Sequence, residues 1–320
     1  MSATIIVPSW NGAHRLQRLL PSLGTSCAVV VVDNGSTDDT AEVLARRFPD
    51  VDVIRFARNH GYSRAVNRAA AVAASETIVL LNDDCVCEQD FAERLAGALD
   101  PSRGVAMAAG VLLEAHDPTV VDSAGIELDD TLLVFDYLNG QPVSVLTRAL
   151  ADPLGPSGAA AAFDRSAFLE CGGFDERLFA YWEDVDLVLR LRLAGARCVL
   201  VPDARVVHSH SATLGSGSAR KNYLTGFGRS YMLRKWGVVR GRRGAAAVAR
   251  EVGICAAQLA VDRTPAGIRG RLAGWHAGGM ERHPYPKAAV TQSRHSVATE
   301  LRRRARRRRR LRRGMTSADS

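Results

Sequence analysis

Two groups of carboxylates and one histidine have the types and spacing that a transfer reaction could use. Asn82-Asp83-Asp84 directly follows an apolar, strand-like run, Glu183-Asp184 opens a helical pattern, and His208 ends the extended run ARVVH. Carboxylate and imidazole groups bind divalent cations, and Mg²⁺ commonly joins one or two carboxylates to substrate phosphates. A carboxylate within hydrogen-bond reach of a hydroxyl can also remove its proton. These residues therefore fit a metal-assisted group transfer.

Each of these features also has a purely structural explanation. Acidic residues in the first turn of a helix interact favourably with the helix dipole, and an NDD run can be a solvated loop. A single histidine is more often structural than a ligand. Asp33, which follows the run AVVVV, can cap the next helix or contact a nucleotide. The chain lacks G-x-x-x-x-G-K-[ST] and G-x-G-x-x-G, so neither a P-loop nor a Rossmann dinucleotide site is expected.

The elements expected around these residues alternate between strand and helix. Short β-rich runs separated by helical patterns predict an α/β fold with a mostly parallel sheet flanked by helices. In such sheets, ligands bind at the carboxyl ends of the strands. Asp33, Asn59 and the run from Asn82 to Asp84 should therefore converge. The expected strands are residues 4–8, 28–33, 51–56 and 77–83, and the expected helices cover residues 13–22, the segment after STDDT, and 63–74.

The middle of the chain is less regular. Residues 110–158 are rich in Asp, Gly and Pro and favour a hairpin or loop region. A short helix is expected after the small residues GAAAAF, and EDVDLVLRLRLAG predicts a helix that ends at Gly195. A strand over 196–202 and an extended segment over 204–210 should follow. From residue 216 onward, the pattern becomes helical and basic.

Composition and charge indicate a folded protein with two unlike parts. Residues 1–215 carry 17 arginines and no lysine against 29 acidic residues, a net charge of −12, whereas residues 216–300 carry +11 and residues 301–320 carry +9. The six cysteines are scattered without zinc-like pairing, which favours buried free thiols in a reducing compartment. We expect neither a signal peptide nor a transmembrane segment, because Arg250 and Glu251 interrupt the most apolar late stretch.

Six motifs, in order, resemble family 2 glycosyltransferases of the GT-A fold, with the closest likeness to bacterial rhamnosyltransferase-type and galactofuranosyltransferase-type members. The resemblance covers about residues 3–230. It implies a GT-A catalytic domain over residues 1–215. The residue pattern and charge predict a basic helical extension over 216–300 and a disordered Arg-rich tail over 301–320. The motifs are TIIVPSWNG, VVVVDNGSTDDT, RNHGYSRAVNRA, IVLLNDD, GGFDERLFAYWEDVDLVLRLRLAG and VPDARVVHSHSA.

The resemblance also implies binding residues, position by position. Asp84 matches the main ligand of a divalent cation, Mg²⁺ or Mn²⁺, although Asn82 replaces the first aspartate of the family's D-x-D motif. His208 matches a histidine that completes the metal site in some members, and His210 is the alternative within HSH. The positions that match the nucleotide-sugar site are Pro8, Asn11, Asp33, Asn59, Gly61, Ser63 and Asp83.

The implied activity is an inverting, metal-dependent transfer of a sugar from a nucleoside diphosphate, UDP- or dTDP-linked, to a saccharide or lipid-linked saccharide acceptor in cell-envelope synthesis. Asp184 matches the catalytic base of the family's ED motif, while Trp182 and Glu183 match acceptor-side positions. A departing diphosphate needs a cation as Lewis acid, and an acceptor hydroxyl needs a base. Alternatives are a non-catalytic nucleotide-sugar or glycan-binding protein of the same fold, which would lack the base or the metal carboxylate, and a nucleotidyltransferase, which would carry a Gly-rich basic loop that SWNGAHR does not provide.

Three interpretations remain for the basic C-terminal part of a protein expected to be cytoplasmic. It can bind the anionic inner face of the plasma membrane, bind nucleic acid through phosphates, or be a solvated tail. Apolar residues recur at helical spacing from Val248 to Leu259, which favours insertion at a membrane interface. The tail lacks interleaved aromatic residues for base stacking, so nucleic acid is a less favoured partner.

Overall fold

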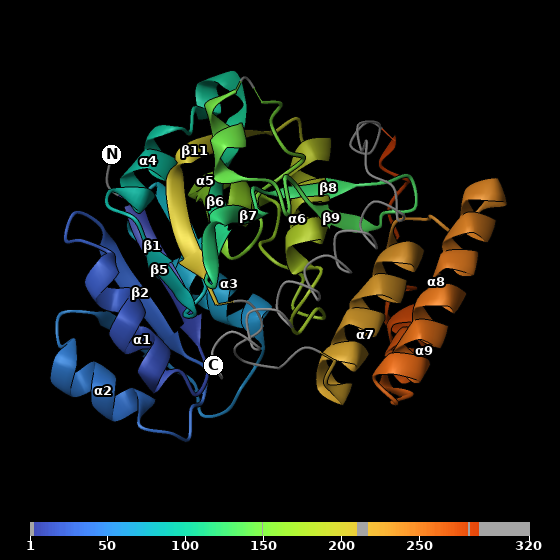
Figure 1. The fold of residues 1–320 in the computed structure, drawn as a ribbon, viewed down its shortest axis with the longest axis horizontal. Helices are drawn as coiled ribbons and strands as arrows, with labels where there is room; N and C mark the ends of the chain where they lie inside the picture. Colours follow the sequence, from blue (N-terminus) through green and yellow to red (C-terminus); the bar gives the residue numbers. More distant parts are fainter. Residues whose placement is uncertain (1–2, 149, 210–216, 281, 288–320) are drawn as a thin grey trace, which may run out of the picture.

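A nine-stranded sheet forms the centre of the fold (Figure 1). The computed structural model describes residues 3–148, 150–209, 217–280 and 282–287. Six strands run in one direction, whereas β5, β7 and β10 run against them. The order across the sheet is β3 (Asp52–Arg55), β2 (Ala28–Asp33), β1 (Ala3–Ser9), β4 (Thr77–Leu81), β10 (Ala160–Asp164), β6 (Val105–Glu114), β11 (Arg197–His208) and β5 (Cys85–Cys87), with β7 (Asp117–Ser123) on β6. The expected α/β fold with a mostly parallel sheet is confirmed.

Helices cover both faces of this sheet, and β1 shows why. Alternate side chains of a strand point to opposite faces, so Ile5 and Val7 join one hydrophobic cluster and Ile6 joins the other. The first cluster is covered by α1 (Ala13–Leu19), α2 (Thr40–Arg47) and α4 (Phe91–Gly97), and the second by α3 (Tyr62–Val72), α5 (Arg165–Glu170) and α6 (Glu183–Leu193). A separate two-stranded sheet pairs β8 (Ile126–Leu128) with β9 (Val134–Asp136).

The sequence analysis missed two central strands. Residues 105–114 form β6, in which all ten residues are buried, and Ala160–Asp164 form β10 between β4 and β6. Alanine has a weak strand preference, and strand preference depends strongly on packing context. Here β10 is buried and paired on both sides, so small side chains fit. The two segments expected around residues 196–210 are instead joined in one long strand, β11, with an irregular pairing between Leu200 and Arg205.

The C-terminal part is helical, as expected, and consists of α7 (Ala219–Lys235), α8 (Gly241–Val261) and α9 (Ala266–Ala277). α9 lies very close to α7: a Cβ added at Gly270 or Gly274 would come 2.0 Å from the carbonyl oxygens of Tyr223 and Phe227. Only glycine allows that approach. The Arg-rich stretch 301–320 lies outside the described residues.

Buried charges attach α7 to the part of the molecule that contains the large sheet. Lys235, only 1% exposed, places its Nζ 2.9 Å from Asp175 Oδ2 and 3.0 Å from Asp186 Oδ1. Asp186, fully buried near the start of α6, also accepts a hydrogen bond from Trp236 Nε1 at 3.0 Å. Tyr231 and Trp236 share a hydrophobic cluster with α3 and α6. α7 lies beyond the predicted boundary near residue 215, yet it packs directly against α6.

Replacing Lys235 with methionine should destabilise the protein by about 3 kcal/mol, the lower end of the range for breaking a buried ion pair, because Asp186 and Asp175 lose Lys235 while Asp186 keeps Arg190 at 2.9 Å. The free energy of unfolding is measured by urea denaturation. Lys287→Met is the matched control, since Lys287 is exposed, and surface substitutions usually change stability by no more than about 0.5 kcal/mol. Equal stability of the two variants would contradict a role for Lys235 in anchoring α7.

Candidate active site

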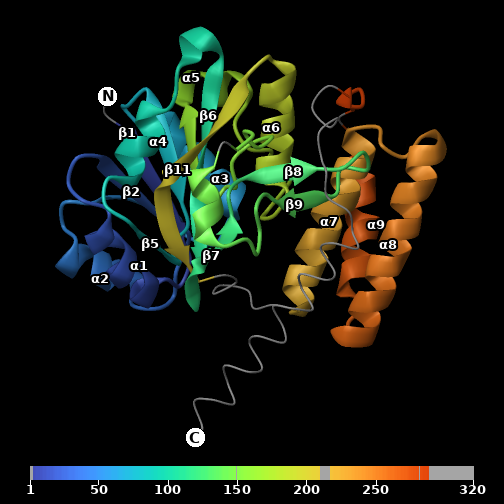
Figure 2. The same cartoon turned by 45° about the horizontal axis from the view of Figure 1, so that its top comes forward.

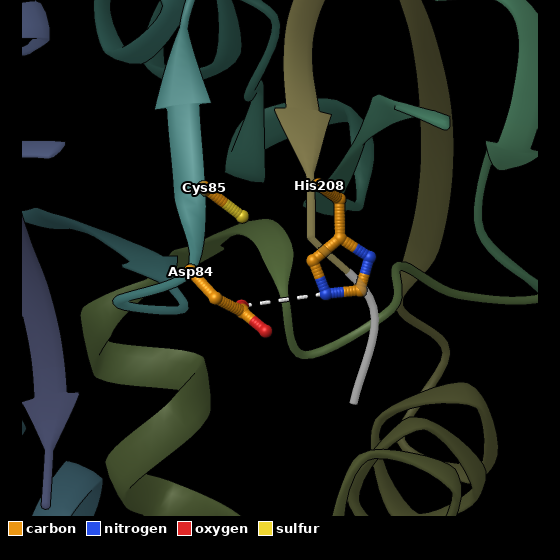
Figure 3. Close-up of side chains that lie close together, drawn as sticks. All are labelled: Asp84, Cys85 and His208. Atoms are coloured by element: carbon orange, nitrogen blue, oxygen red, sulfur yellow. Dashed lines mark ion pairs between the residues drawn. The ribbon is translucent and has the colours of Figure 1, made fainter. Parts of the chain in front are cut away.

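The turn after β4 and the end of β11 bring a carboxylate and an imidazole together. β5 pairs with the end of β11, so Cys85 lies opposite His208, and the Ser209 amide donates to the Asp84 carbonyl at 2.9 Å. The side chains of Asp84 and His208 point toward one another, with Asp84 Oδ1 3.4 Å from His208 Nε2 (Figure 3). Within the described part of the chain, Asp84 Oδ1 is buried and accepts no hydrogen bond. A buried carboxylate oxygen facing an imidazole nitrogen fits a divalent cation site.

A second carboxylate orients the histidine. Asp122, on β7, places Oδ2 2.9 Å from His208 Nδ1. Burial lowers the pKa of His208, but the neighbouring Asp122 and Asp84 carboxylates outweigh it and raise that pKa to about 9. A carboxylate bonded to one ring nitrogen leaves the other directed at the ligand site. Asp122 was not among the residues expected from the sequence.

Cys85 is the third side chain near this position. The possible ligand atoms of Asp84, Cys85 and His208 lie within 4.8 Å of one another. Burial, followed by the charge of Asp84, raises the pKa of the Cys85 thiol well above its ordinary value. The thiol is therefore neutral at physiological pH, and hard cations such as Mg²⁺ and Mn²⁺ prefer oxygen ligands. Cys85 is better explained as a packing residue than as a ligand.

Asp184 and the Asn82–Asp84 turn both contact the segment Gly158–Ala159. Asp184 Oδ2 accepts a hydrogen bond from the Gly158 amide at 3.2 Å, while the neighbouring Ala159 carbonyl accepts one from Asn82 at 3.4 Å. Tyr62 donates its hydroxyl proton to the Gly158 carbonyl at 2.7 Å. Burial, and then the charges of nearby carboxylates that include Asp184 and Asp84, raise the pKa of Tyr62. The charges of Asp84 and Asp184 therefore both contribute to the raised pKa of Tyr62.

Burial also raises the pKa of Asp184, despite the amide hydrogen bonds that its carboxylate accepts. Its neighbour Glu183 is 7% exposed, and its Oε2 accepts no hydrogen bond from the described residues. Burial and the adjacent Asp184 charge raise the pKa of Glu183 well above its ordinary value. Burial thus makes both of these neighbouring carboxyl groups weaker acids than exposed ones.

The two residues before this pair adopt left-handed backbone conformations. Tyr181 has φ 71° and Trp182 has φ 76°, which is uncommon for large side chains. Trp182 is held by α7: its Nε1 donates to the Thr225 carbonyl at 3.2 Å, and the Arg229 guanidinium lies 5.4 Å from its ring centre. Its indole therefore contacts α7. The backbone conformation sets the direction in which α6 begins.

Asp83 is engaged inside the protein. Arg15 on α1 donates to both of its oxygens at 2.9 Å, and the Ser9 hydroxyl donates to Oδ2 at 2.6 Å. Ser9 lies opposite Asp33 at the ends of β1 and β2. Arg15 is thereby held beside the Asn82–Asp84 turn. Arg15 was not among the residues expected from the sequence.

The predicted convergence of the strand ends is confirmed, and Asn34 makes the connection. Its side chain donates to the Gly61 carbonyl at 2.9 Å and accepts from the His60 amide at 2.8 Å. The backbone N–H of Asn34 donates to the Ser9 carbonyl at 2.8 Å. Asp33 is fully buried; its Oδ1 accepts from the Ser36 amide, and its Oδ2 lies 3.3 Å from Arg55 Nε.

The remaining predicted donor-site residues mostly fix loops. Asn11 accepts from the Thr37 amide at 2.8 Å, and Asn59 accepts from the Gly61 amide at 2.9 Å. Gly61, with φ 89°, approaches Phe179 so closely that a Cβ would lie 2.4 Å from its carbonyl oxygen. The Ser63 hydroxyl donates to the Leu178 carbonyl. Pro8 lies within β1, opposite Val32. The start of α3 therefore packs against the loop before α6 and forms hydrogen bonds with it.

Comparison with known proteins supports a single family. The profile described as glycosyl transferase family 2 matches residues 4–114, and that of glycosyl transferase family group 2 matches residues 77–310. An N-acetylglucosaminyl-diphospho-decaprenol L-rhamnosyltransferase of Mycobacterium tuberculosis is 30% identical over 243 residues, which cover 67% of this chain and 78% of the relative. An O-antigen chain rhamnosyltransferase of Salmonella anatum is 27% identical over 66% of this chain and 67% of its own length.

Solved structures share the fold. GalNAc-T7, crystallised with UDP, GalNAc and Mn²⁺, superposes with a TM-score of 0.61 at 15% identity, covering 94% of this chain and 57% of that one. A mannosyltransferase from Pyrobaculum calidifontis in complex with GDP-Man and Mn²⁺ gives 0.52 at 19% identity, with coverage of 87% and 86%. The expected GT-A fold is confirmed. The chain belongs to glycosyltransferase family 2 and is a nucleotide-sugar glycosyltransferase.

Proposed function

We propose that this enzyme transfers a sugar, with inversion, from a UDP- or dTDP-linked donor to a saccharide or lipid-linked saccharide acceptor in cell-envelope synthesis. The observation that carries the proposal is that the Asn82–Asp84 turn and the start of α6 both bond to the Gly158–Ala159 segment: the Asn82 amide donates to the Ala159 carbonyl, and the Gly158 amide donates to Asp184 Oδ2. Asp84 itself faces His208. Candidate cation ligands and a candidate base that adjoin one short segment suit displacement of a diphosphate by a hydroxyl.

The proposed cation ligands are Asp84 and His208. Asp84 supplies a buried oxygen that lacks a hydrogen bond, and His208 Nε2 faces it while Asp122 holds Nδ1. A divalent cation, Mg²⁺ or Mn²⁺, supplies Lewis-acid stabilisation of the leaving diphosphate. Mn²⁺ in the related structures of the same fold is consistent with this choice.

The donor site of the proposal lies at the ends of β1, β2 and β4. The loops there are fixed by contacts within the protein, which favours a preformed site. Asp83 is proposed to hold Arg15 where its guanidinium contacts the donor phosphates. Asp33 is proposed to contact the nucleoside of the donor. The other residues proposed for this site are Pro8, Asn11, Asn59, Gly61 and Ser63.

Asp184 is proposed to take the proton of the acceptor hydroxyl. Its raised pKa makes it a better base than an exposed aspartate, and the amides of Gly158 and Val185 hold its carboxylate in place. Glu183, whose pKa is raised by burial, is proposed to contact the acceptor hydroxyls. Trp182 is proposed to form one wall of the acceptor site. The hydrogen bond from its indole to α7 fixes its position.

A lipid-linked acceptor would place the reaction at the inner face of the plasma membrane. The support for this is the relative whose name specifies a diphospho-decaprenol-linked acceptor. The proposal therefore includes a cytoplasmic enzyme that works at the membrane surface.

Asp184→Asn should lower kcat by about 10²–10⁴-fold, the usual contribution of a general base, while donor affinity stays near that of the wild type. Transfer is measured alongside calorimetric titration of the donor. For the wild type, kcat/KM should rise with pH through a pKa above the ordinary aspartate value, because the base must be deprotonated. Asp203→Asn, at an exposed carboxylate of β11, is the control. Near-normal turnover of Asp184→Asn would exclude it as the base.

Asp84→Asn should act on metal-dependent donor binding. The carboxylate is the main proposed ligand, so its loss should weaken UDP binding in Mn²⁺ by more than the roughly 10–100-fold typical of losing an outer-sphere partner. UDP affinity is titrated with Mn²⁺ and with a chelator. If Asp84→Asn bound UDP as the wild type does under both conditions, the metal assignment would be wrong.

Asp122→Ala should weaken Mn²⁺ binding by about 10–100-fold, because His208 loses the group that orients its ring. Asp122→Asn should restore part of this affinity, since the amide oxygen can still accept from Nδ1. Mn²⁺ affinity is measured directly by electron paramagnetic resonance, with circular dichroism to confirm folding. Equal loss in both variants would point to a structural role alone.

A further inference from the structure

Helix α8 presents an apolar face that no described residue covers. Between Ala245 and Val261, a fully described stretch, eleven residues are exposed, and all of them are Ala, Val, Leu or Gly. Val248 and Val252 are 53% and 65% exposed. In both views, α8 lies on the outer side of α7, away from the sheet (Figures 1 and 2). Surface helices normally present polar residues to water, and a contiguous apolar patch marks an interaction site.

The two charged residues in the middle of α8, Arg250 and Glu251, point inward. Arg250 pairs with Asp129 beside β8, and Glu251 pairs with Arg229 of α7 and Arg271 of α9, each at 2.7 Å. By length and composition alone, α8 could span a membrane, in contrast to the expectation from the sequence. Spanning would break these pairs and leave Arg229, which is 2% exposed, buried without its carboxylate. The ion pairs therefore favour a helix lying flat on the domain.

The neighbouring helix and the helix ends complete an amphipathic surface. α9 exposes Leu272 (63%) and Trp275 (37%), and tryptophan favours the boundary between water and lipid. Exposed arginines stand at the two ends of α8: Arg240 precedes it, Arg242 lies in its first turn, and Arg263 follows it. An apolar centre with cationic ends matches an anionic bilayer surface, where apolar groups enter the interface and arginines meet the headgroups.

We propose that α8 and α9 form the surface by which the enzyme binds an anionic lipid bilayer. A second copy of the chain fits this face less well. Whether two α8 helices pair in parallel or antiparallel, the cationic ends of one meet the cationic ends of the other. The inference rests on this surface and not on the proposed reaction, although a lipid-linked acceptor would explain its use.

Flotation of the full chain with vesicles tests the surface. Wild type should bind phosphatidylcholine vesicles that contain phosphatidylglycerol. The double variant Val248→Glu/Val252→Glu should bind them at least about tenfold more weakly, since two carboxylates enter the apolar face. Arg240→Gln/Arg242→Gln should lose roughly 30-fold on the anionic vesicles, about fivefold for each arginine, with little change on phosphatidylcholine alone. The matched control is Val53→Glu/Val72→Glu, which alters two exposed valines elsewhere and should bind as the wild type does.

The outcomes separate this inference from the proposed reaction. All variants keep residues 301–320, so the Arg-rich tail cannot produce a difference among them. Transfer to a water-soluble saccharide, measured in parallel, should be unchanged by every substitution. Unaltered vesicle binding by Val248→Glu/Val252→Glu would overturn the proposal. So would a wild type that binds no vesicles, or one that forms a dimer which the same substitution dissociates. A wild type that binds vesicles but transfers no sugar would contradict the proposed reaction and leave the membrane surface unaffected.

Discussion

The buried pair between Lys235 and Asp186 is the interaction on which the arrangement of the two halves depends. It joins the first turn of α6, which carries Asp184, to the last turn of α7. A buried ion pair adds little net stability compared with apolar packing, but it strongly penalises any arrangement that separates its members. Because the partners lie on different helices, this penalty fixes one position of the C-terminal helices relative to Asp184, the proposed base.

The sequence predicted the elements that follow the common rules of parallel α/β folds. β1 to β4 and the three helices between them alternate in apolar periodicity, so they could be placed to within a few residues. The family motifs pointed to Asp84, His208 and Asp184 as candidate ligands and candidate base. β10 could not be recognised, because its alanines pack as a strand only between β4 and β6. Strand preference of this kind depends on neighbours that are distant in sequence.

The partners of the site residues were also beyond reach of the sequence. Asp122 meets His208 because β7 and β11 both pair with β6. Arg15 reaches Asp83 across the ends of β1 and β4. No spacing rule connects such pairs. The stripe from Val248 to Leu259 was visible as a pattern, but its exposure follows from Arg250 and Glu251 pointing inward, which the order of residues alone does not reveal.

The short pairing of β5 with β11 has a thermodynamic consequence. Asp84 and His208 stand more than a hundred residues apart along the chain, and only this edge of the sheet brings them within reach of one another. An unfolded chain offers no such pair, so an ion held there binds the native state alone and shifts the folding equilibrium toward it by mass action. Fraying of one three-residue edge strand would release the ion while the rest of the sheet stayed intact.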